Sequence, residues 1–155
     1  MATQADIGHG TILQLFDTVS SPPLGWVNVA EVTSITPPNM TRDAQDATHT
    51  ESPGGWREFI PGLKDAGEVS AELNFVAASD TTALLIAQFD SREVAQARIL
   101  FSDGDQEASP PTCSVWSFSA ILTAFPPEAP VDGKMTAATT FKISGRPTFQ
   151  RALGQ

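Results

Sequence analysis

Apolar and polar residues alternate along much of this chain, and the cleanest stretch is residues 68–76. Its apolar members fall at every second position, at Val69, Ala71, Leu73 and Phe75, with polar residues between them. A period of two places these four side chains on one face of an extended strand. The pattern therefore predicts a β-strand with one face covered by the protein core.

Five further segments carry strand character, through alternation or through enrichment in β-branched residues. They are residues 11–16, 26–36, 95–102, 112–125 and 134–144. The 26–36 segment is predicted as one continuous strand, in which Val27, Val29 and Glu31 share a face. Residues 39–50 are too polar for a core strand, and they form either a strand that is polar on both faces or a loop.

One segment has the features of a helix. Ser79 or Asp80 can cap its N-terminus, because either side chain can accept a hydrogen bond from a backbone N–H of the first turn. Residues 81–89 then supply Leu85 and Phe89, which lie four positions apart and share one face. We expect a short helix packed on one flank of the predicted strands.

Residues 49–67 are predicted to form a long loop. The part from 56 to 67 carries large apolar side chains, but it also contains Pro61 and two glycines, so no regular element is expected there. This segment is longer than the ~12–15 residues at which loops become uncommon and usually serve a function.

These elements add up to about seven strands and one helix, which is typical of a mainly β fold. We expect a β-sandwich or β-barrel with one flanking α-helix, in a single domain covering residues 1–155. The small, polar residues 1–9 are interpreted as a flexible N-terminal arm. A chain of this length hides roughly 70% of its unfolded surface on folding, so it can build a sizeable core.

The charge balance narrows the function. Nine basic residues stand against 18 acidic ones, for a net charge of −9, and the basic residues are scattered along the sequence. Tight binding to nucleic acid through phosphate contacts needs clustered Lys and Arg, so it is not expected.

The single cysteine, Cys113, excludes a disulfide within the chain and is compatible with a reducing cytoplasm. No signal peptide and no membrane-spanning run of ~20 apolar residues is present.

Side chains for catalysis are nearly absent. His9 and His49 both lie in polar surroundings, whereas a Ser/His/Asp site needs a histidine that is held by packed neighbours. A zinc site needs three or four suitably spaced ligands, and one cysteine with two distant histidines does not supply them. We therefore expect a protein that is not an enzyme and has no metal or cofactor.

Four stretches, in this order, carry a resemblance to a known family. They are residues 64–75 (KDAGEVSAELNF), 84–89 (LLIAQF), 97–104 (ARILFSDG) and 139–147 (TTFKISGRP). Together they make the chain similar to the major tail tube proteins of lambda-like siphophages over nearly its whole length. Contractile tails contain tubes of the same fold, and the sequence leaves that alternative open.

The resemblance implies a structural virion protein that forms rings of six subunits, stacked into the hollow tail tube. Strands of neighbouring subunits would join in one barrel, which removes exposed sheet edges. The 49–67 loop would reach the next ring, and residues 148–155 would form a C-terminal arm toward a neighbouring ring. The expected contact residues are Trp56, Phe59, Ile60, Leu63 and Arg146. Alternatively, the apolar residues fasten the loop to the subunit's own core.

The same resemblance gives the acidic charge a use. Thr41, Asp43, Asp46 and Thr48 are expected to face the lumen, where a negative wall repels phosphates and lets DNA slide without specific binding. The implied partners are other copies of the chain, a tape-measure protein in the lumen, and the tail terminator and baseplate or tip proteins. The implied location is the virion tail, assembled in the cytoplasm of the host bacterium, with no membrane contact.

Other functions remain open. A tail terminator or head–tail connector would keep the ring but would not polymerise. A carbohydrate-binding β-sandwich is disfavoured, because the chain has no Tyr and only three Trp to stack on sugars. An esterase-like enzyme is disfavoured by the presence of only two histidines.

Overall fold

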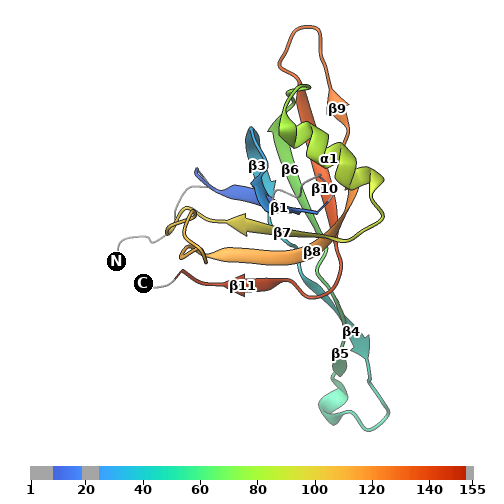
Figure 1. The fold of residues 1–155 in the computed structure, drawn as a ribbon. Coiled ribbons are helices and arrows are strands. Elements are labelled where there is room, and N and C mark those ends of the chain that lie inside the picture. The colour runs from blue at the N-terminus through green and yellow to red at the C-terminus, as the bar shows by residue number, and fades with distance from the viewer. Residues whose placement is uncertain (1–8, 19–24, 153–155) are drawn as a thin grey trace.

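The protein is built around one large, curved antiparallel sheet, from which a two-stranded hairpin projects (Figure 1). The structure is a computed structural model that describes residues 9–18 and 25–152. Within these ranges the strands are β1 Ile12–Asp17, β2 Gly25–Asn28, β3 Val32–Thr36, β4 Thr41–Asp46, β5 Phe59–Asp65, β6 Glu68–Asn74, β7 Ala95–Leu100, β8 Val115–Ala124, β9 Pro127–Glu128, β10 Thr136–Ile143 and β11 Thr148–Gln150. The helix α1 covers Asp80–Asp90, and a 3-10 turn, η1, covers Pro53–Gly55. The prediction of a mainly β fold with one flanking α-helix is confirmed.

The large sheet has the strand order β2-β1-β7-β8-β10-β6-β3, with β11 added to β8 and β9 added to β10. All of its pairings are antiparallel. The remaining pair, β4 and β5, forms a separate sheet. The body of the molecule is therefore the nine-stranded sheet with α1, and the hairpin is the only described element outside it (Figure 1).

The core lies on one face of the large sheet, because apolar residues occupy alternate positions in its strands. In β10, Ala137, Thr139, Phe141 and Ile143 are buried and the residues between them are partly exposed. Phe141 is among the largest side chains that are fully buried. Thr139 is also fully buried, and its hydroxyl donates to the carbonyl of Ala71, which satisfies a polar group that would otherwise be costly to bury.

Helix α1 closes the core on one flank. Ser79 caps it by accepting a hydrogen bond from the backbone N–H of Thr82, so the first of the two predicted caps is the one used. Leu84 and Leu85 reach the core, but Phe89 is half exposed. The buried position next to the C-terminal end of the helix is Gln88 instead. Thus Leu85 and Phe89 do not share a covered face.

Two strand predictions were wrong. Residues 26–36 do not form one strand, because Glu31 adopts a φ of 61° between β2 and β3 and turns the chain there. Residues 56–67 do not lack regular structure, because β5 forms across Pro61 and Gly62 and pairs with β4. Of the two alternatives for residues 39–50, a strand with both faces polar is the one present, since all six residues of β4 are exposed.

The last described strand lies on the body of the molecule and does not extend from it as an arm. Residues 148–150 of the predicted C-terminal arm form β11, which pairs with β8, and the Phe149 ring lies 4.9 Å from that of Trp116. Residues 153–155 and residues 1–8 of the predicted N-terminal arm lie outside the described ranges. No helix in the described part of the chain combines the length and apolar character that crossing a membrane requires.

Candidate assembly surface

The hairpin of β4 and β5 brings the two sets of predicted site residues together. Asp46 pairs with Phe59 and Gln45 with Ile60, while Thr41 pairs with Asp65 at the other end. The predicted lumenal residues lie on or just after β4, and three of the predicted contact residues lie on β5. β4 is therefore mostly polar, whereas β5 is mostly apolar from Phe59 to Leu63 and ends in the charged Lys64 and Asp65 at the base of the hairpin.

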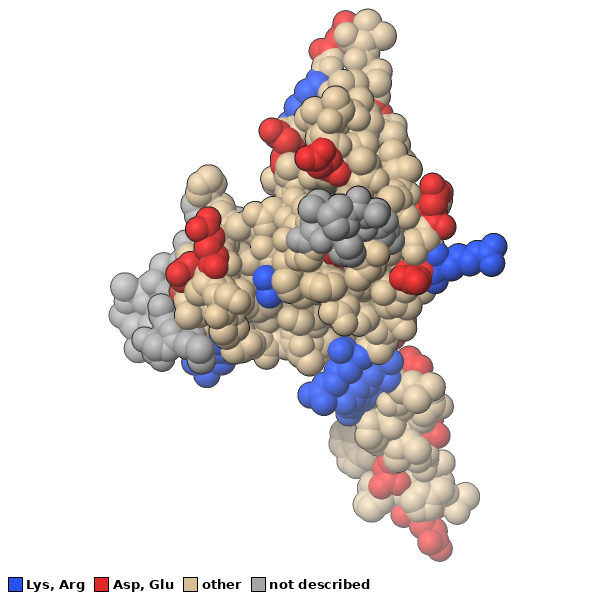
Figure 2. Space-filling view, in the orientation of Figure 1, with Lys and Arg blue, Asp and Glu red and all other residues tan. Residues whose placement is uncertain are grey.

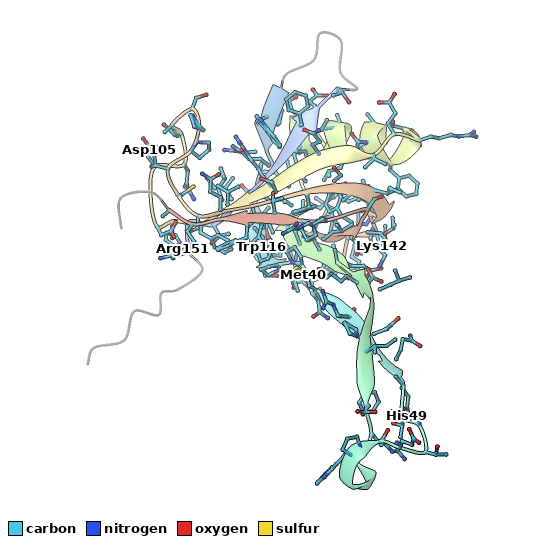
Figure 3. All side chains as sticks on the ribbon, turned by 90° about the horizontal axis from the view of Figure 1, so that it is seen from below. Met40, His49, Asp105, Trp116, Lys142 and Arg151 are labelled. Carbon is cyan, nitrogen blue, oxygen red and sulfur yellow. The ribbon has the colours of Figure 1, made fainter. Side chains whose placement is uncertain are left out.

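The tip of the hairpin, residues 47–58, is held by hydrogen bonds within itself. Gly54 and Gly55 both adopt a left-handed φ, which lets the chain reverse through η1. The Glu58 carboxylate accepts a hydrogen bond from the Ser52 hydroxyl at 2.7 Å, and it lies 3.2 Å from Nδ1 of His49. Figure 3 shows His49 at the end of the hairpin farthest from the body. The tip has a defined shape without packing on a core.

The four predicted apolar contact residues are exposed. Trp56 is 77% exposed and Leu63 is 86% exposed, with Phe59 and Ile60 each at 55%. None of them belongs to the hydrophobic core or to the residues packed against it. The alternative that they fasten the segment to the subunit's own core is therefore wrong. An isolated subunit leaves these large side chains in water, and exposed apolar patches of this kind mark interaction surfaces.

The four predicted lumenal residues, Thr41, Asp43, Asp46 and Thr48, are exposed as well. Hydrogen bonds from the side chain and backbone of Thr48 hold the pKa of Asp46 below its usual range. The backbone bond, from the Thr48 N–H to Asp46 Oδ1, measures 2.9 Å. Asp46 therefore keeps its negative charge at neutral and mildly acidic pH.

A cluster of hydrogen bonds fixes the hairpin where it joins the body. The Asp65 carboxylate accepts a hydrogen bond from the Gly67 N–H at 2.8 Å and pairs with Lys142 Nζ at 3.1 Å. The Gly67 N–H, followed by Lys142, holds the pKa of Asp65 below its usual range. Gly67 has a φ of +76°, and a Cβ at this position would lie 2.5 Å from the carbonyl oxygen of Asn39. Only glycine fits this close approach.

Basic side chains gather at the same junction. Arg42, Lys64 and Arg146 line a groove of about 750 Å³, which also has Met40, Trp116 and Phe149 in its wall. We call this the basal groove. Figure 2 shows Lys and Arg side chains concentrated where the hairpin leaves the body, and Figure 3 shows Met40, Trp116 and Lys142 in that region.

The basal groove corrects one interpretation of the sequence. The basic residues are scattered along the chain, but folding brings three of the nine into one groove from segments far apart. Within the described residues, the side chains of Arg42, Lys64 and Arg146 make no hydrogen bond or ion pair. Arg146, one of the predicted contact residues, belongs to this groove at the base of the hairpin, whereas Trp56 belongs to the tip.

The described residues do not assemble a recognisable catalytic arrangement. His9, Asp103 and Ser114 line one cavity, but the Ser114 hydroxyl donates directly to Asp103. A catalytic triad instead places histidine between the serine and the carboxylate. The Ser114 hydroxyl, followed by the Ser114 backbone N–H, which donates to Asp103 Oδ1 at 2.8 Å, holds the pKa of Asp103 below its usual range. No group of three His, Cys, Asp or Glu side chains suited to a metal ion occurs within residues 9–18 and 25–152.

Comparison with known proteins decides the family. Residues 14–150 match the family model of the lambda phage tail tube protein. The chain belongs to the lambda phage tail tube protein family. The resemblance noted in the sequence is thereby confirmed, and the protein is a structural component of the tail tube, located in the virion tail. Among curated proteins, none matches this tail tube protein by sequence.

Solved structures from a particle tail, a tail tube and a baseplate share the fold. One is a chain from the tail of an empty gene transfer agent particle, with a TM-score of 0.74, 20% identity and coverage of 94% of this chain and 99% of that chain. A second comes from the SPP1 tail tube, with a TM-score of 0.69, 6% identity and coverage of 95% and 80%. A third, from the baseplate of the anti-feeding prophage, has a TM-score of 0.69, 12% identity and coverage of 97% and 98%.

Proposed function

We propose that six copies of this tail tube protein form a ring, and that the rings stack into a hollow tube through which phage DNA passes into the host. The observation that carries this proposal is the projecting hairpin with its exposed Trp56, Phe59, Ile60 and Leu63. A hairpin that stands apart from its own core is suited to contact with another copy. The similar tail of the gene transfer agent was determined with C6 symmetry, which supports rings of six.

The two edges of the hairpin suggest how it sits in the tube. The β5 edge, with its apolar side chains, would lie against the next ring. The β4 edge, with Thr41, Asp43 and Asp46 and the following Thr48, would face the lumen. Negative charge at this edge disfavours close contact with DNA phosphates. We place the C-terminal residues 148–155 near a neighbouring ring.

The proposed partners follow from a tube that is filled and closed at both ends. A tape-measure protein would occupy the lumen before DNA does, and a terminator and a baseplate or tip complex would bind the two ends. Assembly would take place in the cytoplasm of the host bacterium, in a siphophage tail. The proposed role is structural throughout, with no catalytic step and no cofactor.

Electron microscopy of the concentrated, purified protein tests the stacking. Wild-type protein is expected to form long hollow tubes with six-fold symmetry. A variant in which residues 47–58 are replaced by Asn-Gly, a turn suited to joining two directly paired residues, is expected to fold and to stop stacking. Single rings of the wild-type protein would favour the terminator or connector, and wild-type tubes from the shortened variant would contradict the role of the hairpin.

The lumenal assignment needs a separate test in assembled phage. The double variant Asp43→Lys/Asp46→Lys is expected to form tubes but to slow or block DNA ejection, because DNA phosphates would bind the added cations. The matched control is Glu107→Lys/Asp132→Lys, which makes the same change of charge on exposed residues of the body. Normal ejection by the Asp43→Lys/Asp46→Lys phage would contradict the lumenal position of β4.

A further inference from the structure

The basal groove holds cations without partners in a strongly acidic protein. Arg42, Lys64 and Arg146 line it, and within the described residues none of their side chains has a hydrogen bond or ion pair. Its one acidic side chain, Asp65, is already paired with Lys142. A gathering of unpaired cations in a chain of net charge −9 is a site for a negatively charged ligand.

The wall of the groove restricts what that ligand is. Phe149 is half exposed and its ring lies against that of Trp116 at a tilt of 48°, and Met40, which is also exposed, lines the same wall. A DNA duplex keeps its bases paired and stacked, so its phosphate backbone offers these apolar side chains nothing to contact, whereas a protein segment with acidic and aromatic residues matches both features. Charge complementarity together with aromatic anchors is the usual make-up of a specific protein interface.

The tip of the hairpin is such a segment. Residues 47–58 contain two carboxylates, Glu51 and Glu58, against one cation, Arg57, and they also carry the exposed Trp56. In Figure 2 the acidic side chains appear along the hairpin and the basic ones at its base. The molecule therefore carries an acidic, aromatic surface and a basic, aromatic groove at opposite ends of one element.

These two surfaces cannot meet within one subunit. The β5 strand that separates them is seven residues long, which sets its ends about 20 Å apart at ~3.3 Å per residue. A contact between them must join two copies, with a different surface used on each. Such head-to-tail contacts propagate into open filaments when they do not close on themselves.

We propose that the basal groove is the receptor for the hairpin tip of a second copy, in the adjacent ring. The inference rests on the proposed function, since it names the surface that receives the hairpin when rings stack. The carboxylates of the tip pair with Arg42, Lys64 and Arg146, and Trp56 packs beside Phe149. Each subunit thus offers one tip and one groove, and every ring repeats the same contact with the next.

Charge reversal on each surface provides the test. The tip variant is Thr50→Lys/Glu51→Lys, and the groove variant is Arg42→Glu/Arg146→Glu; all four side chains are exposed and make no hydrogen bond or ion pair within the described residues. Each variant alone is expected to raise the protein concentration needed for tube formation by about tenfold or more, equivalent to ~1.4 kcal/mol. Circular dichroism and thermal unfolding check that both variants fold like the wild type.

Mixing the two variants separates this contact from a general loss of assembly. In the mixture, the positive tip of one chain meets the negative groove of the other, and the unaltered tip meets the unaltered groove. Tubes are therefore expected to return in the mixture at close to the wild-type concentration. The control variant Arg92→Glu/Lys134→Glu, which changes two exposed cations outside the groove, is expected to assemble like the wild type.

Other outcomes overturn the inference. Two results, in an experiment where the wild type forms tubes, would show that the tip does not bind the groove. Either each variant assembles as well as the wild type, or the mixture of the two variants stays unassembled. In both cases only this inference fails. If the groove variant assembles normally but loses binding to a short DNA duplex that the wild type binds, the groove serves DNA instead. If the wild type itself forms no tubes, the proposed function fails first.

Discussion

The body and the hairpin of this tail tube protein use the same residue types in opposite ways. Phe141 on β10 is fully buried, while Phe59 on β5 is 55% exposed. The body buries most of its large apolar side chains, fully or partly, within one subunit, whereas the hairpin leaves its own exposed to solvent. The contrast indicates that the body folds for itself, whereas the hairpin carries apolar side chains for a surface that another copy supplies.

The largest expected effect comes from removing a buried ring of the body. Phe141→Ala is expected to lower the free energy of unfolding by about 3–5 kcal/mol, because it leaves a cavity in a close-packed core. Urea denaturation measures this loss. A loss below about 1 kcal/mol would contradict the contrast between body and hairpin, since Phe141 would then contribute no more to the stability of the subunit than an exposed residue.

The junction is expected to be the next most sensitive position. Gly67→Ala forces a side chain into a left-handed φ and against the Asn39 carbonyl, so it should cost at least about 1–3 kcal/mol. Gly145→Ala is the matched control, because Gly145 also has a positive φ but nothing lies within 4 Å of its missing Cβ. Equal losses for the two variants would show that the close approach to Asn39 does not matter.

The hairpin residues are expected to affect the single subunit least. Trp56→Ala and Phe59→Ala should each change the free energy of unfolding by less than about 0.5 kcal/mol, as exposed substitutions usually do. Both should nevertheless reduce tube formation, measured by sedimentation and electron microscopy. If either variant destabilised the subunit as much as Phe141→Ala, the separation between body and hairpin would be wrong.

The pH dependence of the junction sharpens the comparison further. The pKa of Asp65 is depressed in the folded protein, so its contacts with Gly67 and Lys142 contribute fully above the ordinary carboxyl pKa of 3.8. That contribution is lost as the pH falls through the lower, folded pKa. An NMR titration of the Asp65 carboxyl should give a value below 3.8, and Lys142→Met should raise it. An unshifted titration would show that these contacts do not hold in solution.

The body was largely predictable from the sequence, because its strands are covered on one face. Burial on one face produces the alternation seen at Val69, Ala71 and Leu73, and that pattern fixed β6 closely. The turn at Glu31 was missed, since a left-handed φ at a non-glycine residue leaves no pattern in the sequence. Phe89 was assigned to the covered face of the helix because residue spacing does not show which residue, Gln88 or Phe89, meets the core.

The hairpin was only partly predictable, for the opposite reason. No face of β5 is buried in the subunit, so alternation is absent, and Pro61 with Gly62 argued against a strand. Their effect is accommodated by a bulge in the pairing with β4. The exposed apolar residues were found because large side chains in a polar, glycine-containing segment need a surface to contact. The basal groove was missed, because it joins cations more than 100 residues apart, Arg42 and Arg146.

Hydrogen–deuterium exchange of the hairpin, before and after assembly, tests the central claim most directly. In the dissociated subunit, amides of β4 and β5 are expected to exchange much faster than those of β6 and β10, because no core covers them. In tubes the hairpin should become as protected as the body. The account would be contradicted by a hairpin that is already protected like the core in the single subunit, or by one that stays unprotected in the assembled tube.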